Sequence, residues 1–170
     1  MIIREATATD VSQMQTVRNA VKENKLSDPS VISDQDYIDF LSYNGKGWVA
    51  IIDDLITGFA FADIINNNIW ALFVHPDHEG KGIGRSLHEV MLDWYFYQSK
   101  DFVWLGTAPK TRAETFYRRA GWIENGKHGK SEIKFEMTNT KWKQLRAGQK
   151  NIIHENNVQN EYHSRYCIDH

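Results

Sequence analysis

IWALFVHPDHEGKGIGR, residues 69–85, is the stretch of sequence that decides the fold. Its first six residues are mostly large or β-branched and predict a buried strand, which Pro76 ends because proline does not continue a central strand. Apolar residues then recur at helical spacing, which predicts a helix that packs one face on a core; they are Ile83, Leu87, Val90, Met91 and Trp94.

Three glycines at alternate positions, residues 80, 82 and 84, lie where the predicted helix begins. Glycines there let several backbone N–H groups converge on one anion beside the positive end of the helix dipole, and Lys81 and Arg85 add formal charge. The segment is not a P-loop, because no Lys-Ser or Lys-Thr pair follows Gly84, and its third glycine comes one residue too early for a dinucleotide-binding fingerprint. We therefore predict a phosphate site of another kind.

The same segment resembles the signature of the GCN5-related N-acetyltransferase (GNAT) family. In that family a strand and a proline-containing turn precede Gln/Arg-x-x-Gly-x-Gly/Ala and a long helix, and the segment holds the pyrophosphate of acetyl-CoA. Here the match is Glu79-x-x-Gly82-x-Gly84, with Glu79 where the family usually has Gln or Arg. A glutamate side chain that points sideways into the turn would be compatible with a phosphate there.

A second motif downstream, Ala113-x-x-Phe116-Tyr117-x-x-x-Gly121-Trp122, resembles the family's Asn-x-x-Ala-x-x-Phe-Tyr-x-x-x-Gly-Phe. Lys110 occupies the position of the asparagine, from which a lysine could reach a phosphate of CoA. Both motifs occur in the family's order, with a predicted strand at 102–107 between them. Together they are a specific signal.

The predicted elements follow the order of the GNAT fold over residues 1–137. They are strands at 2–6, 48–52, 56–65, 69–74 and 102–107, helices at 9–21, 83–94 and 111–120, a short helix capped by Ser33, and a hairpin of 122–124 and 132–137. The expected turns and loops are 22–33, 44–47 and 125–130. We expect an α+β fold (α/β by some schemes) with a mixed, mostly antiparallel central sheet, a parallel splayed strand pair and flanking helices. A single GNAT domain is expected at residues 1–140, with a helical, polar extension at 141–170.

Composition is that of an ordinary globular chain, with 41% hydrophobic and 12% aromatic residues and a formal net charge of −2. No apolar run is long enough to span a membrane and the N-terminus lacks a signal-peptide pattern, so we expect a cytoplasmic protein with no membrane partner. The single cysteine, Cys167, excludes an internal disulfide, and the scattered histidines do not indicate a metal site.

Charge is divided unevenly along the chain. Up to residue 69 acidic residues outnumber basic ones, and from 70 to 150 basic residues outnumber acidic ones. A basic half would suit a polyanionic cofactor and an acidic half a cationic amine, although solvated surfaces that merely differ in sign would give the same pattern. The basic residues do not form a dense patch on a basic chain, so nucleic acid is not an expected partner.

The resemblance implies acetyl-CoA as cosubstrate and a primary amine of a small molecule as acceptor, which attacks directly in a ternary complex. The family seats the pantetheine arm between two splayed strands, where the Val74 N–H would stabilise the oxyanion and Tyr117 would protonate the leaving thiolate. Asp63 is a candidate general base, with a structural carboxylate on a hairpin as the alternative. The expected cofactor-binding residues are Phe73, Val74, Glu79, Gly80, Lys81, Gly82, Ile83, Gly84, Arg85, Ser86, Lys110, Phe116 and Arg119.

Two other functions stay open on the sequence. The acceptor could be the amine of a protein or peptide, or the chain could be a catalytically weak CoA-binding sensor or interaction module, which Glu79 and Lys110 favour. Walls of the acceptor site are expected from Tyr37, Phe40 and Tyr43 and from residues 127–130. The Asn-, Gln- and His-rich tail at 151–170 is expected to dock on the domain or on a second subunit of a homodimer.

Overall fold

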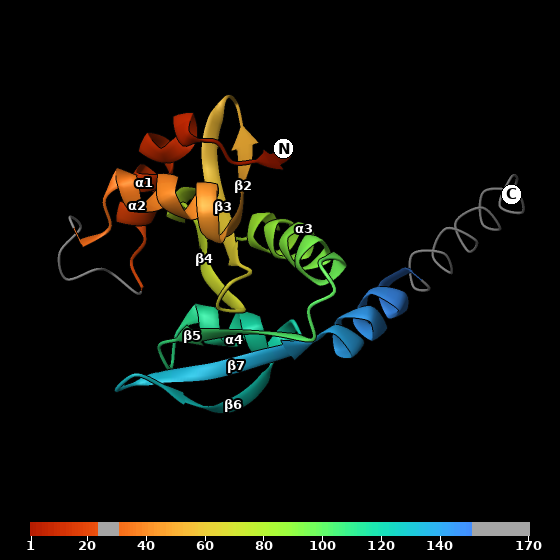
Figure 1. The fold of residues 1–170 in the computed structure, drawn as a ribbon. Helices are drawn as coiled ribbons and strands as arrows, with labels where there is room; N and C mark the ends of the chain where they lie inside the picture. The colour runs from red at the N-terminus through yellow and green to blue at the C-terminus, as the bar shows by residue number, and fades with distance from the viewer. Residues whose placement is uncertain (24–30, 151–170) are drawn as a thin grey trace, which may run out of the picture.

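The computed structural model describes residues 1–23 and 31–150, which form one seven-stranded sheet flanked by helices (Figure 1). The strand order is β1-β2-β3-β4-β5-β7-β6. The strands are β1 (Ile2–Glu5), β2 (Gly45–Ile52), β3 (Leu55–Asp63), β4 (Asn68–Val74), β5 (Phe102–Thr107), β6 (Ile123–His128) and β7 (Glu132–Thr138). The helices are α1 (Val11–Ala20), α2 (Asp34–Asp39), α3 (Ile83–Tyr97) and α4 (Arg112–Arg119), with short turns at Ala8–Asp10, Phe40–Asn44 and Pro76–His78. All strand pairs are antiparallel except β4 and β5, which confirms the expected α+β fold.

Two clusters of buried side chains lie on opposite faces of this sheet. On one face α1 and α2 pack over β2, β3 and β4, and the buried residues there include Val11, Met14, Val17, Tyr37, Phe59 and Phe61. On the other face α3 packs over β2, β3 and β4, and its buried residues Ile83, Leu87 and Met91 belong to a cluster that continues to β5 and β7. Gly58 of β3 makes room for α3, since a Cβ there would lie 3.0 Å from Ile83 Cγ2 and 3.1 Å from Leu87 Cδ1. The start of α3 is therefore fixed directly on the sheet.

The parallel strands β4 and β5 touch only where they begin. Their register contains one pair, Asn68 with Trp104, and the Trp104 N–H donates to the carbonyl of Asn67 at 2.9 Å. Beyond this point the strands diverge, and Figure 1 shows β5, β6 and β7 running in a different direction from β2, β3 and β4. The predicted splayed pair is confirmed, and it leaves one edge of β4 without a strand partner.

Two turn predictions are wrong. Residues 44–47 are not a turn before a strand at 48, because β2 already begins at Gly45 and pairs with Asp63 of β3. The absence of a side chain at Gly47 allows this, since a Cβ there would collide with the ring of Phe61. Likewise β6 continues to His128 instead of ending at 124, because a register shift at Asn125-Gly126 accommodates the extra residues within the strand.

A further helix covers residues 139–150, where the sequence predicts the beginning of a helical extension at 141. It is anchored by Trp142, which is buried and whose indole N–H donates to Asp93 Oδ1 on α3 at 2.9 Å. The tail at 151–170, with Cys167, and most of the loop expected at 22–33 lie outside the described residues. Within the described ranges, no helix is both long and apolar enough to cross a membrane.

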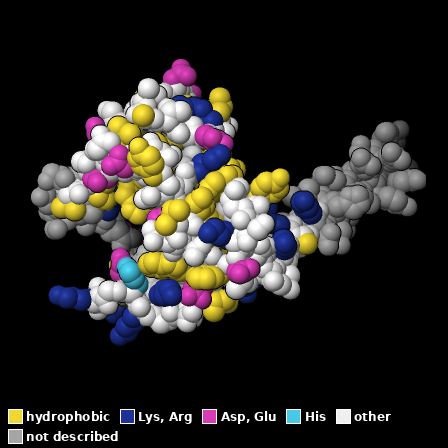
Figure 2. All heavy atoms as spheres, in the orientation of Figure 1, with side chains coloured by type: hydrophobic (Ala, Val, Ile, Leu, Met, Phe, Trp, Pro, Cys, Tyr) yellow, Lys and Arg dark blue, Asp and Glu magenta, His cyan; other side chains and the backbone are white. Residues whose placement is uncertain are grey.

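The surface shows the charge division that the sequence indicates. In Figure 2 acidic side chains gather over the α1–α2 end of the molecule, and Lys and Arg side chains gather around the tip of the β6–β7 hairpin. The segments near the ends of β4 and β5 lie between these two regions in Figure 1. An anionic and a cationic ligand could therefore approach this part of the fold from different sides.

Candidate functional site

The glycine-rich segment after β4 forms an uncapped helix start. Gly80 and Gly82 have positive φ angles of 74° and 80°, and Gly82 is the N-cap of α3 without a side-chain cap. The first amides of α3 are therefore left for a ligand, at the positive end of the helix dipole. A Cβ built at either glycine meets nothing within 4 Å, so the space in front of these amides is open. This geometry suits the phosphate site that the sequence predicts.

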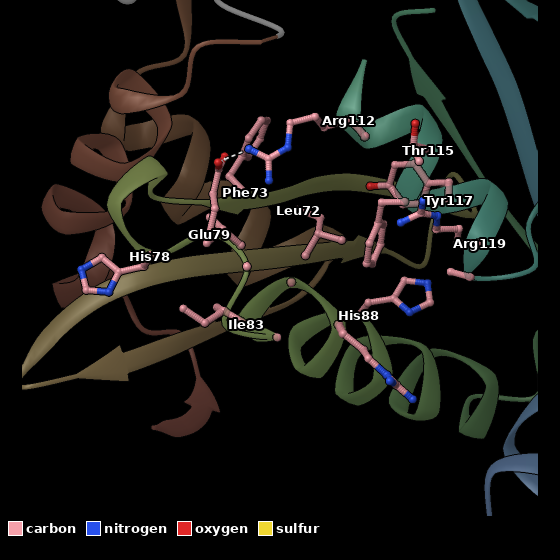
Figure 3. A pocket seen from close by; sticks show the side chains of 18 of the residues that line it. Leu72, Phe73, His78, Glu79, Ile83, His88, Arg112, Thr115, Tyr117 and Arg119 are labelled. Carbon is pink, nitrogen blue, oxygen red and sulfur yellow. Dashed lines mark hydrogen bonds and ion pairs between the residues drawn. The ribbon is translucent and has the colours of Figure 1, made fainter. Parts of the chain in front are cut away.

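A cleft of about 1020 Å³ runs from this helix start along β4 to α4 (Figure 3). It brings together most of the predicted site residues, namely Phe73, Val74, Glu79, Gly80, Gly82, Ile83, Gly84, Arg85, Phe116, Tyr117 and Arg119. Three predicted cofactor-binding residues do not line it: Lys81, Ser86 and Lys110. Lys81 Nζ instead lies 3.4 Å from the carbonyl of Asp77. Lys110 is exposed in a left-handed conformation, and its backbone N–H donates to Glu114 Oε2 at 2.6 Å.

The backbone of β4 presents polar groups to this cleft. The His75 N–H donates to the carbonyl of Thr57 at 2.8 Å, so in the antiparallel register Phe73 exchanges hydrogen bonds with Phe59 of β3. The alternate residues, Leu72 and Val74, therefore point their N–H and C=O groups toward the gap between β4 and β5. The backbone of Phe73 is bonded to β3 and its ring packs on Phe59, whereas Leu72 is a backbone position at the cleft that the sequence reasoning missed.

Tyr117 lies at the far end of the cleft from the glycines. Its ring is buried against Phe116, Trp122 and Phe135, and burial raises the pKa of the phenol above its ordinary value. In Figure 3 its hydroxyl points into the cleft. Among the described residues no group hydrogen-bonds to this hydroxyl. The Tyr117 hydroxyl is therefore protonated and can donate a hydrogen bond to a ligand in the cleft.

The mouth of the cleft is bridged by an ion pair that the sequence did not reveal. Arg112, the first residue of α4, binds the Glu79 carboxylate with a guanidinium nitrogen (Figure 3). The backbone N–H of Arg112 donates to Glu23 Oε2 at 2.8 Å, so a second carboxylate caps α4. Glu79 therefore points sideways toward α4, and Arg112 brings a positive charge to the position that the family motif fills with Gln or Arg.

His88 of α3 is one of the residues that line the cleft, and it joins α3 to the segment after α4. Its Nε2 accepts a hydrogen bond from the Trp122 indole N–H at 2.9 Å, and its ring meets the edges of Phe116 and Trp142 at 5.5 Å. Burial lowers the pKa of His88 to about 3, so the imidazole is neutral at neutral pH. Its role in the described structure is to hold the two walls together.

Asp63 is not brought to the cleft. It is buried at the end of β3, where Oδ1 accepts from the backbone N–H groups of Ile65 and Asn66 at 2.8 and 2.9 Å. Its Oδ2 accepts from Asn66 Nδ2 at 2.8 Å. The carboxylate holds the β3–β4 turn, at the end of β4 remote from Val74, so the structural alternative to a base accounts for it.

Of the residues expected to line the acceptor site, some are buried in the core and others are exposed on the surface. Tyr37 and Phe40 are buried, and Phe40 stacks on Trp70 with ring centroids 4.9 Å apart. Tyr43 is 78% exposed, and residues 127–130 are exposed at the β6–β7 tip. In the described part of the chain, no group of three His, Cys, Asp or Glu side chains could hold a metal ion.

The geometry agrees with comparisons to known proteins. Residues 44–124 match the family model described as the acetyltransferase (GNAT) domain, which includes the glycine segment and Tyr117. The sequence-based resemblance to this family is therefore confirmed. No curated protein sequence matches the chain.

Solved structures share the fold at low sequence identity. A GNAT-family acetyltransferase from Staphylococcus aureus Mu50 is 20% identical with a TM-score of 0.71, over 81% of this chain and 98% of that one. The PaiA N-acetyltransferase of Thermoplasma acidophilum, solved in complex with coenzyme A, is 16% identical with a TM-score of 0.69, over 81% and 98% of the two chains. The yncA protein of Salmonella typhimurium, solved with its cofactor acetyl-CoA, is 17% identical with a TM-score of 0.66, over 82% and 94%.

Proposed function

Because the chain carries a GNAT acetyltransferase domain, we propose that it transfers the acetyl group of acetyl-CoA to a primary amine of a small molecule, by direct attack in a ternary complex. The observation that carries this proposal is a single cleft that joins the uncapped start of α3, the unpaired edge of β4 and the hydroxyl of Tyr117. These are the three features that the cosubstrate's pyrophosphate, pantetheine arm and sulfur require.

The described residues offer a complementary group to each part of acetyl-CoA. The open space in front of Gly80 and Gly82 accommodates the pyrophosphate against the free amides of α3. Arg85, Arg112 and Arg119 line the same cleft and offer guanidinium groups to the phosphates. The N–H and C=O groups of Leu72 and Val74 can bond to the amides of the pantetheine arm, as a neighbouring strand would.

The chemistry follows from two donors. The amine nitrogen attacks the thioester carbon, and the Val74 N–H stabilises the negative charge that develops on the carbonyl oxygen, a contact worth about 3 kcal/mol in the transition state. The Tyr117 hydroxyl donates to the sulfur as the C–S bond breaks. The raised pKa of Tyr117 keeps the hydroxyl protonated until the thiolate forms.

Turnover tests this proposal directly. Thiol release from acetyl-CoA is measured over a panel of primary alkylamines, polyamines and peptides with a free N-terminus, and we expect a small amine to be the best acceptor. Tyr117→Phe should lower kcat about 100-fold for this amine and leave KM for acetyl-CoA unchanged, because general-acid catalysis contributes about this factor. Tyr97→Phe is the matched control, since Tyr97 is 86% exposed.

Each part of the proposal has an outcome that contradicts it. An unchanged kcat in Tyr117→Phe removes the acid assignment. Faster transfer to peptides than to any small amine changes the acceptor class. Binding of acetyl-CoA without turnover of any amine favours a CoA-binding module in place of an enzyme.

A further inference from the structure

One face of the second half of the sheet carries a group of polar side chains outside the cleft. On β5, Val103 and Leu105 point into the core beneath α3 and α4, so Trp104 and Gly106 face the opposite side. In the described structure the buried cluster under α1 and α2 contains no residue of β5, β6 or β7. This face of β5 is therefore open to a second substrate, on the other side of the sheet from Tyr117.

Gly106 marks the point where β4 and β5 begin to separate. In the parallel register Asn68 lies opposite Trp104, so Gly106 is two residues beyond the last strand pair, where no pairing with β4 remains. Here the side chain of Glu132, from the start of β7, occupies the space above the glycine. A Cβ built on Gly106 would lie 2.5 Å from Glu132 Oε2 and 3.1 Å from His128 Cδ2. The carboxylate turns an oxygen toward this position, whereas the histidine turns a ring carbon.

The neighbours of Glu132 leave its carboxylate unpaired. Lys134 Nζ is 2.9 Å from Glu136 Oε1 and lies over the Trp104 ring, so the nearest ammonium on β7 has another partner. The His128 ring packs on Trp104 with centroids 4.7 Å apart. Among the described residues no hydrogen bond or ion pair is formed by the Glu132 carboxylate. It can therefore accept a proton or hold an ammonium group from solution.

We propose that Glu132 is the general base of the acetyl transfer, which receives the ammonium form of the amine at Gly106 and removes its proton. This rests on the proposed function. It places the base on one face of β5 and the acid, Tyr117, on the other, because Tyr117 packs on Phe135 from the core side. The proton acceptor for the amine and the proton donor for the sulfur are then separate groups, on different faces of the sheet.

The proposed transfer releases one proton overall. The ammonium gives one proton to the Glu132 carboxylate, and the neutral nitrogen forms the N–C bond to the acetyl carbon. When the C–S bond breaks, the sulfur takes the hydroxyl proton of Tyr117, the second proton lost by the nitrogen passes to solvent, and a proton from solvent restores the hydroxyl. The proton on Glu132 passes to solvent, so the products are the acetamide, the free thiol and one proton.

Glu132→Gln tests the assignment with acceptors that differ in basicity. For a primary alkylamine, which is protonated at neutral pH, the variant should lose about 100-fold in kcat with KM for acetyl-CoA unchanged. For the β-trifluoro analogue of the same amine, which is mostly neutral at that pH, the loss should shrink to about threefold or less, because no proton needs to be removed before attack. Glu136→Gln is the matched control on the same face of β7, and it should retain wild-type kcat with both amines.

Gly106→Ala provides a second variant that keeps the carboxylate but moves it. The added methyl group meets the end of the flexible Glu132 side chain, so the chain should fold and bind acetyl-CoA as before while kcat for the alkylamine falls. An equal loss on both amines in Glu132→Gln, or no loss on the alkylamine, would overturn the assignment and leave the proposed function standing. A wild-type protein that turns over no amine would overturn both.

Discussion

The two sides of the splayed strands are built in different ways. The cofactor side consists of consecutive segments: the end of β4, the glycine turn, the start of α3, and one further helix, α4. The acceptor side is assembled from single residues of three strands, with Trp104 and Gly106 on β5, His128 on β6 and Glu132 on β7. The first is a site made of backbone amides in a fixed local order, and the second is a site made of side chains that only the sheet brings together.

The two sides also differ in their charged side chains. Arg85, Arg112 and Arg119 line the cofactor cleft together with the carboxylates of Glu23, Asp77, Glu79 and Glu89, whereas Glu132, Glu136 and Lys134 lie on the open face of β7. The guanidinium groups can bind a polyanion and the unpaired Glu132 carboxylate can bind an ammonium group, so the two ligands use different sets of side chains. If this division is correct, changes on the cofactor side should act on acetyl-CoA binding, and changes on the acceptor side should act on kcat.

The largest expected effect is on the cofactor side, at the N-cap of α3. Gly82→Asp should weaken acetyl-CoA binding by about 100-fold or more. The new carboxylate would occupy the position of the phosphate, which could then no longer bind the free amides at the start of α3. Isothermal calorimetry measures this. Gly126→Asp is the control, since Gly126 also has a positive φ, 83°, and open space around it but lies on β6. Equal affinities of the two variants would contradict the pyrophosphate site.

A smaller effect on acetyl-CoA affinity is expected at the Arg112–Glu79 ion pair, and its sign should differ between variants of the two residues. Arg112→Ala should weaken acetyl-CoA binding about tenfold, or about 1.4 kcal/mol, because one guanidinium is lost from the phosphates. Glu79→Gln should strengthen it severalfold, because Arg112 no longer has a competing carboxylate. Acetyl-pantetheine, which lacks the pyrophosphate, should show neither change. The same change with both ligands would mean that the pair only shapes the cleft.

The smallest expected effect is on the free energy of unfolding, at His88, which connects α3 to the segment after α4. The pKa of His88 is about 3 in the folded protein and near 6.5 when unfolded, so between these values the unfolded chain binds a proton that the native protein does not. The free energy of unfolding should therefore fall by about 1.4 kcal/mol per pH unit below 6.5 on account of this group. Urea unfolding of wild type and His88→Gln at pH 7.5 and 5 checks this.

The difference between the two His88 proteins is the informative quantity, because other groups also titrate in acid. The Arg4 guanidinium, for example, lowers the pKa of Asp10 in both. His88→Gln should lose less stability than wild type between the two pH values. Parallel losses would show that His88 is not kept neutral by burial.

The cofactor side could be predicted from the sequence because its features are local. Glycines at alternate positions before a helix predict free backbone amides at the helix start. In the same way, Phe116-Tyr117 at a fixed spacing from Gly121 predicts a helix that carries the Tyr117 phenol. The alternation of β4 could even have indicated Leu72 beside Val74, since backbone groups two residues apart face the same edge.

The acceptor side could not be predicted in this way. Asp63 is a candidate base in the sequence because it lies on the strand before β4, but its carboxylate holds the turn at Asn66. Arg112 and Glu132 carry no local pattern: one acts through an ion pair with a residue 33 positions earlier, and the other through a glycine on a neighbouring strand. Such pairings depend on strand register and helix placement, which the sequence pattern does not specify.

Amide hydrogen exchange along β4 tests the central claim, that the cosubstrate lies between the splayed strands as a strand would. On addition of acetyl-CoA, the amides of Leu72 and Val74 should exchange at least about tenfold more slowly, because each gains a hydrogen-bond partner. The amide of Phe73, already bonded to Phe59 in the register of β3 and β4, should change little. Binding that protects only the amides of residues 80–85, with Leu72 and Val74 unchanged, would contradict the account.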